Sequence, residues 1–214
     1  KKFVFEELKL REITAKNPTE IIRVLDLEDY KKIVDGFEDK KNPDIAFFGK
    51  EPERNYKFGI RKVYQIYSKP NRIILNGMKS YINQIKDPKI KTLFRFVFSS
   101  ILFNCSLLSA YTKYENTTYR TGTYYIPRVV KDNNPLDSFY SKFKLIVNTL
   151  KDLYSKDIPV FIYNGSATNL KSLDKETIDY VYIDPPYSDI INYSELNLVW
   201  EAWLDLSSDY KDEI

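Results

Sequence analysis

Four consecutive residues, Asp184-Pro185-Pro186-Tyr187, combine a carboxylate, two prolines and an aromatic ring. They follow the apolar run from Tyr180 to Ile183, whose residue types predict a buried strand, and ligands of open α/β sheets bind beyond the carboxyl ends of strands. Prolines fix φ and lack an N–H, so the carbonyl oxygens of such a turn accept hydrogen bonds without a competing donor. Two acceptors beside a stacking ring suit the exocyclic amino group of a base lifted out of its stack. The alternative is a plain proline turn after a strand.

Several helices are predicted by an Asn or Asp cap followed directly by proline. Asn17-Pro18 and Asn134-Pro135 precede apolar residues at helical spacing, and Asp87-Pro88 opens a stripe that predicts one long helix over residues 88–111. Pro70 opens a further helix over about 70–86. These helices fill the first two-thirds of the chain.

The periodicity changes after Leu153. Residues 158–163 and 178–183 are short β-branched and aromatic runs, which predict two buried strands joined by 170–176. The expected fold class is therefore α/β: a partial Rossmann-like methyltransferase sheet with two recognisable strands and a large helical N-terminal part. We place the domain boundary between a helical region, 1–154, and a part of a catalytic α/β domain, 155–214.

Charge is segregated along the chain. Residues 50–144 carry 18 basic and 6 acidic side chains, whereas residues 145–214 carry 5 basic and 13 acidic ones. A basic stretch of this size attracts polyanions, because neutralising phosphates releases counterions. The alternatives are a solvated lysine-rich surface, or pairing of the two blocks within one fold.

Composition excludes several kinds of chemistry. The chain has no histidine and one cysteine, Cys105, so it has no intramolecular disulfide, no Ser-His or Cys-His pair and no expected metal site. No apolar run is long enough to cross a bilayer and no signal peptide is recognisable, so we expect a cytoplasmic protein without membrane contact.

The segment Ile183–Tyr187 resembles motif IV of the amino-methyltransferases, which use S-adenosylmethionine to methylate exocyclic nitrogens of DNA bases. An acidic first residue is typical of the N6-adenine enzymes. The resemblance implies that Asp184 and the Pro185 carbonyl accept from the target amino group, that Pro186 holds the turn and that Tyr187 stacks on the flipped adenine. Residues 192–204 are similar to a stretch of one subgroup of adenine-specific DNA methylases, which links the chain to DNA methylation and restriction-modification.

Upstream, residues 161–167 resemble the motif III of that family, which borders the adenosyl group. The resemblance implies S-adenosyl-L-methionine as cofactor. It places the cofactor against four consecutive residues: Asn164, Gly165, Ser166 and Ala167. The alternative is a glycine-containing turn at the end of a strand.

A glycine-rich motif I is missing. The six glycines lie too far apart to form the loop that approaches the cofactor in that family. We therefore expect a fragment whose missing upstream part supplies motif I, and a homodimer that pairs exposed sheet edges.

The expected function is site-specific adenine-N6 DNA methyltransferase. DNA is the expected partner, and five basic residues are the candidates for contacting it: Lys89, Lys91, Arg95, Arg120 and Arg128. One alternative is a non-catalytic nucleic-acid-binding module. Another is an RNA base methyltransferase, because similar tetrapeptides occur in enzymes with other substrates.

Overall fold

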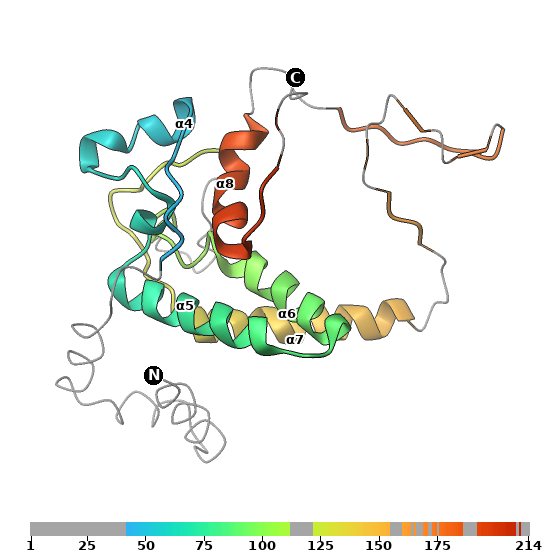
Figure 1. Ribbon diagram of the computed structural model, residues 1–214, viewed down its shortest axis with the longest axis horizontal. Coiled ribbons are helices and arrows are strands. Elements are labelled where there is room, and N and C mark those ends of the chain that lie inside the picture. Colours follow the sequence, from blue (N-terminus) through green and yellow to red (C-terminus); the bar gives the residue numbers. More distant parts are fainter. Residues whose placement is uncertain are drawn as a thin grey trace, which may run out of the picture.

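The fold is a helical body from which extended segments project (Figure 1). The structure, a computed structural model, describes residues 42–111, 122–154, 160–163, 165, 169–170, 173–174, 176–185, 192–208 and 210. The helices in chain order are α4 (Lys50–Glu53), the 3₁₀ turns η2 (Tyr56–Phe58) and η3 (Val63–Ile66), α5 (Lys69–Gln84), α6 (Pro88–Ile101), α7 (Pro135–Tyr154) and α8 (Tyr193–Leu204).

Side-chain caps begin α6 and α7 where the sequence predicts them. The Asp87 carboxylate accepts from the backbone N–H of Lys89 at 2.8 Å and of Ile90 at 3.0 Å, which starts α6. The Asn134 amide oxygen accepts from the Leu136 N–H at 2.9 Å and starts α7. These caps satisfy N–H groups that have no partner within the helix. The predictions of helices over 70–86 and after Asn134-Pro135 are confirmed, and the Asn17-Pro18 helix lies outside the described residues.

The long helix predicted over 88–111 is shorter than expected. α6 ends at Ile101, and irregular turns follow. The Ser106 hydroxyl donates to the Phe103 carbonyl and accepts from the Leu108 N–H, so a side chain replaces helical backbone bonds. The Leu107 N–H donates to the Ile66 carbonyl at 2.7 Å, which ties this segment to η3.

One core joins α5, α6 and α8. The Trp203 indole of α8 is fully buried and makes edge contacts with Tyr67 and with Phe98 of α6. On the other side of α6, Phe94 packs against Phe139 and Phe143 of α7. Helix α8, although it follows the extended segments in sequence, therefore shares its core with helices that precede them.

The α/β prediction is wrong for the part of the chain that the structure describes. Its only β-type pairings are two isolated bridges, Ala46–Lys62 and Ala110–Val130. The described parts of the predicted strands, 160–163 and 178–183, are extended but belong to no strand and lie away from the helices (Figure 1). A strand forms only when a neighbour supplies backbone partners, and no described segment does so here. The described residues therefore contain no partial Rossmann-like sheet.

Candidate functional site

Asp184 and Pro185 follow directly on the extended segment 178–183. Both residues are exposed, and neither belongs to a helix or a strand. Proline fixes its own φ and disfavours the helical region for the residue before it, so the sequence itself disfavours a helix here. Pro186 and Tyr187 lie outside the described residues. The exposed position of Asp184 and Pro185 leaves both residues accessible from solvent.

The predicted cofactor residues are only partly described, since Asn164, Ser166 and Ala167 lie outside the described residues. A Cβ on Gly165 would lie 2.4 Å from a ring carbon of Tyr163. The Tyr163 ring thus occupies the space that the missing side chain of Gly165 leaves free. The space beside Gly165 is therefore no cradle for S-adenosylmethionine.

Two of the predicted DNA-binding residues contact the ends of neighbouring helices. The Arg95 guanidinium donates to the Leu204 carbonyl at 2.6 Å, at the C-terminus of α8. The Lys91 ammonium donates to the Asn83 carbonyl at 2.9 Å, near the C-terminus of α5. Cations at these positions satisfy carbonyls that the helix leaves unpaired and interact favourably with its dipole. Both side chains thus have a structural role in the body.

The other basic candidates differ in position. Lys89 and Arg128 are exposed, and Arg120 lies outside the described residues. Lys89 lies in the first turn of α6, only two residues from Lys91. It therefore remains a candidate for contacting a polyanion.

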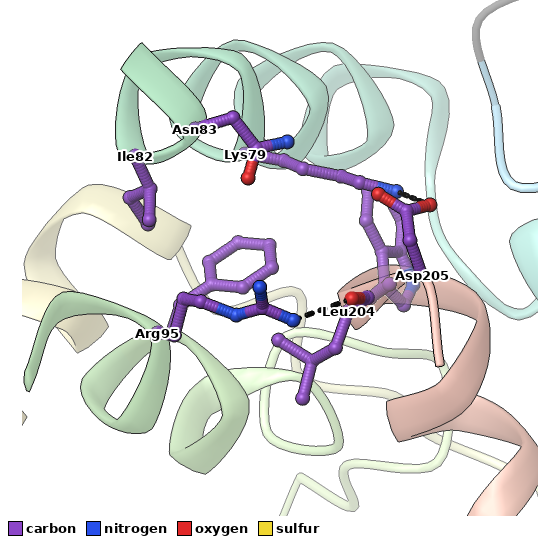
Figure 2. A pocket seen from close by; sticks show the side chains of 8 residues that line it. Lys79, Ile82, Asn83, Arg95, Leu204 and Asp205 are labelled. Carbon is purple, nitrogen blue, oxygen red and sulfur yellow. Dashed lines mark hydrogen bonds and ion pairs between the residues drawn. The ribbon is translucent and has the colours of Figure 1, made fainter. Parts of the chain in front are cut away.

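Arg95 lines a small pocket at the end of α8 that has both charged and apolar walls (Figure 2). Figure 2 shows the Lys79 side chain reaching from α5 to Asp205, where the ammonium and the carboxylate lie 2.6 Å apart. Lys79 also donates to the Ala202 carbonyl at 3.5 Å. The charged groups of the pocket thus pair with α8 and fix its C-terminus against α5 and α6.

Glu195 is a buried carboxylate that our sequence reasoning did not single out. It accepts from the backbone N–H of Lys50 at 3.1 Å and of Glu51 at 2.8 Å. Gly49, with a φ of 89°, leaves room for it: a Cβ there would lie 2.1 Å from the Glu195 carboxyl carbon. The buried Tyr124 hydroxyl donates to the Glu195 carbonyl at 2.8 Å. This contact fixes the N-terminal end of α8.

A second buried carboxylate lies on the same helix. Glu201 accepts from the Tyr210 hydroxyl and, at 3.0 Å, from the Asn197 amide. In the sequence, Glu195 and Glu201 lie among the apolar residues of an otherwise buried helix, and this pattern could have identified them. Both serve to position α8, which follows the Asp184-Pro185 segment.

Burial also changes the acid–base properties of the core. It raises the pKa of the Cys105 thiol from 9.0 to about 11, and it raises the pKa values of the Tyr67 and Tyr124 hydroxyls well above their ordinary range. Cys105 is therefore a protonated thiol near neutral pH, with little nucleophilic character.

Comparison of the chain with known protein families, curated proteins and solved structures finds no match. None of the helices in the described part combines the length and apolar character needed to span a bilayer.

Proposed function

We propose that this chain takes part in adenine-N6 methylation of DNA. The observation that carries the proposal is the Asp184-Pro185-Pro186-Tyr187 tetrapeptide, of which Asp184 and Pro185 are exposed. Two acceptors in sequence can take both N–H groups of an exocyclic amine and direct its lone pair towards an electrophile.

The methyl donor that the resemblance implies is S-adenosyl-L-methionine, which would supply an electrophilic methyl group when bound. Because Gly165 is the only one of the four predicted cofactor residues that the structure describes, the roles we assign concern the amine alone. Asp184 holds and orients the amino group, and the Pro185 carbonyl accepts its second N–H. Together, the Asp184 carboxylate and the Pro185 carbonyl fix the orientation of the amino nitrogen.

The test is methyl transfer from labelled S-adenosylmethionine to adenine-containing duplex DNA, read as N6-methyladenine by mass spectrometry. We expect Asp184→Ala to lower the transfer rate at least about 100-fold, the scale of one lost acid–base group. Asp179→Ala is the matched control, because Asp179 is an exposed carboxylate in the same segment. Equal rates for Asp184→Ala and the unaltered chain would overturn the proposal. Preferential transfer to structured RNA would favour the RNA methyltransferase instead.

The basic helical body favours a second candidate, a nucleic-acid-binding module without catalysis. Lys89 is exposed at the start of α6, within the stretch of excess positive charge. This candidate predicts DNA binding that weakens steeply with salt and ignores S-adenosylmethionine. Lys89→Ala should reduce the salt dependence by about one phosphate contact. Lys91→Ala, whose side chain is bonded to α5, should leave that dependence nearly unchanged.

A further inference from the structure

The turn η2 presents cations and an aromatic ring together at the surface. Phe58 is 64% exposed, and Lys57 and Arg61 beside it are exposed as well. The Lys57 ammonium lies 5.1 Å from the centre of the Phe58 ring. The Arg61 guanidinium carbon lies 4.8 Å from the centre of the Tyr56 ring. We call Lys57, Phe58 and Arg61 the η2 surface.

Contacts inside the body hold this turn in place. The buried Asn55 side chain donates to the Tyr124 carbonyl at 2.8 Å, and the Asn55 carbonyl accepts from the Phe58 N–H at 2.9 Å. Gly59 ends the turn with a φ of 78°, and Ile60 after it is buried. The backbone thus presents the exposed ring in a fixed position, which limits the ordering cost of binding a ligand there.

The charges around the turn favour an anionic partner. Residues 50–62 carry five basic and two acidic side chains. One of the two carboxylates, Glu51, accepts from Arg54 at 3.0 Å and from the Thr123 hydroxyl at 2.6 Å. Proteins that bind single-stranded nucleic acids combine cations that contact the backbone with aromatic rings on which bases stack. The η2 surface offers both kinds of group.

We propose that Phe58 stacks on a base of single-stranded or locally opened DNA, while Lys57 and Arg61 contact the neighbouring phosphates. This role rests on the proposed function, which takes DNA as the substrate. An enzyme that extrudes its target base leaves the strand locally opened, so an unstacked neighbouring base is available. The η2 surface thus holds a nucleotide other than the one whose amino group meets Asp184.

Helix α8 begins beside this part of the body. The Glu195 carboxylate in its first turn accepts from the N–H groups of Lys50 and Glu51 in α4, and η2 follows α4 after two residues. Nine positions separate Asp184 from Tyr193, where α8 begins. A chain of that length spans at most about 32 Å, and a DNA strand covers the same distance in about nine nucleotides. One short stretch of DNA can therefore extend from Asp184 to the α8 end of the body.

The first test is binding of a labelled single-stranded oligodeoxynucleotide to the full chain, measured by fluorescence anisotropy. We expect Phe58→Ala to raise Kd about tenfold, the scale of one lost stacked base. Phe96→Ala is the matched control, because Phe96 on α6 is similarly exposed, at 61%, and it should leave Kd nearly unchanged. Equal Kd values for Phe58→Ala and the unaltered chain would overturn the proposal, as would the absence of binding. Tighter binding of the RNA oligonucleotide of the same sequence would overturn DNA as the partner.

An abasic oligonucleotide separates stacking from charge. It keeps the phosphates but offers no base, so Phe58→Ala should not weaken its binding. Lys57→Ala should reduce the salt dependence by about one phosphate contact on both oligonucleotides. A loss in Phe58→Ala on the abasic strand equal to the loss on the ordinary strand would overturn the stacking role.

Methyl transfer and binding are read separately, so the two proposals can fail independently. If no methyl transfer occurs but Phe58→Ala still weakens binding, the η2 surface is supported and the chain is a binding module. If methyl transfer depends on Asp184 but Phe58→Ala binds the oligonucleotide normally, the η2 surface is wrong and the proposed function stands.

Discussion

The helical body and the extended segments contain similar apolar side chains but expose them very differently. Trp203 and Phe98 are almost completely buried, whereas Phe161 and Ile162 are 77% and 88% exposed. A helix satisfies its backbone hydrogen bonds internally, so it needs only one packed face. A strand needs a neighbour before its side chains can pack. Apolar composition alone therefore does not determine burial.

The largest expected effect distinguishes these two regions directly. Trp203→Ala should lower the free energy of unfolding by about 3–5 kcal/mol, because it empties a fully buried aromatic site. Phe161→Ala should change it by less than about 0.5 kcal/mol. Urea unfolding at a low protein concentration measures the change in unfolding free energy for both variants. A comparable loss in Phe161→Ala would show that residues 160–163 pack within the monomer.

The next effect concerns the contact between α4 and α8. Gly49→Ala should cost about 2–4 kcal/mol, because the new Cβ would collide with Glu195 at a positive φ. Gly59→Ala is the control, since Gly59 also has a positive φ but nothing lies within 4 Å of its added Cβ. Gly59→Ala should lower the free energy of unfolding by about 1 kcal/mol, because only the unfavourable positive φ contributes. Thermal unfolding of the two variants separates strain from collision, and equal losses would contradict the close packing of Glu195.

A smaller effect separates structural from exposed cations. Arg95→Ala should lower the free energy of unfolding by about 1–2 kcal/mol, because it removes a charged hydrogen bond to the end of α8. Lys89→Ala should leave stability within about 0.5 kcal/mol. Denaturant titration compares them. If Arg95→Ala left stability unchanged while weakening DNA binding, the capping role would be wrong.

The smallest effect is a loss of stability at alkaline pH. The pKa of Cys105 is raised in the folded protein, so the unfolded chain releases this proton first, and stability falls as pH rises from about 9 to 11. The unaltered chain should lose about 1 kcal/mol more than Cys105→Ala between pH 9 and 10. The comparison uses the slopes of unfolding free energy against pH, because the cavity in the variant shifts its absolute stability. Parallel slopes would contradict the burial of the thiol.

The helix starts were predictable because their causes are local. Asp87 and Asn134 cap the helix that begins immediately after them, and proline at the first position favours the same start. The end of α6 was not predictable, since it depends on the contact of Leu107 with Ile66 from a distant turn. The failed sheet prediction has the same origin: the residue types of 160–163 and 178–183 favour extended backbone, but strand pairing depends on a neighbour.

By itself, the sequence determined the local features: the capped helices, the extended backbone of the apolar runs, and the order of acceptors in the Asp184-Pro185 segment. Only the tertiary structure decided which polar groups meet. It buried Glu195 against the backbone of α4 and turned Arg95 towards the end of α8. Those choices depend on contacts between residues more than a hundred positions apart, for which local sequence carries no signal.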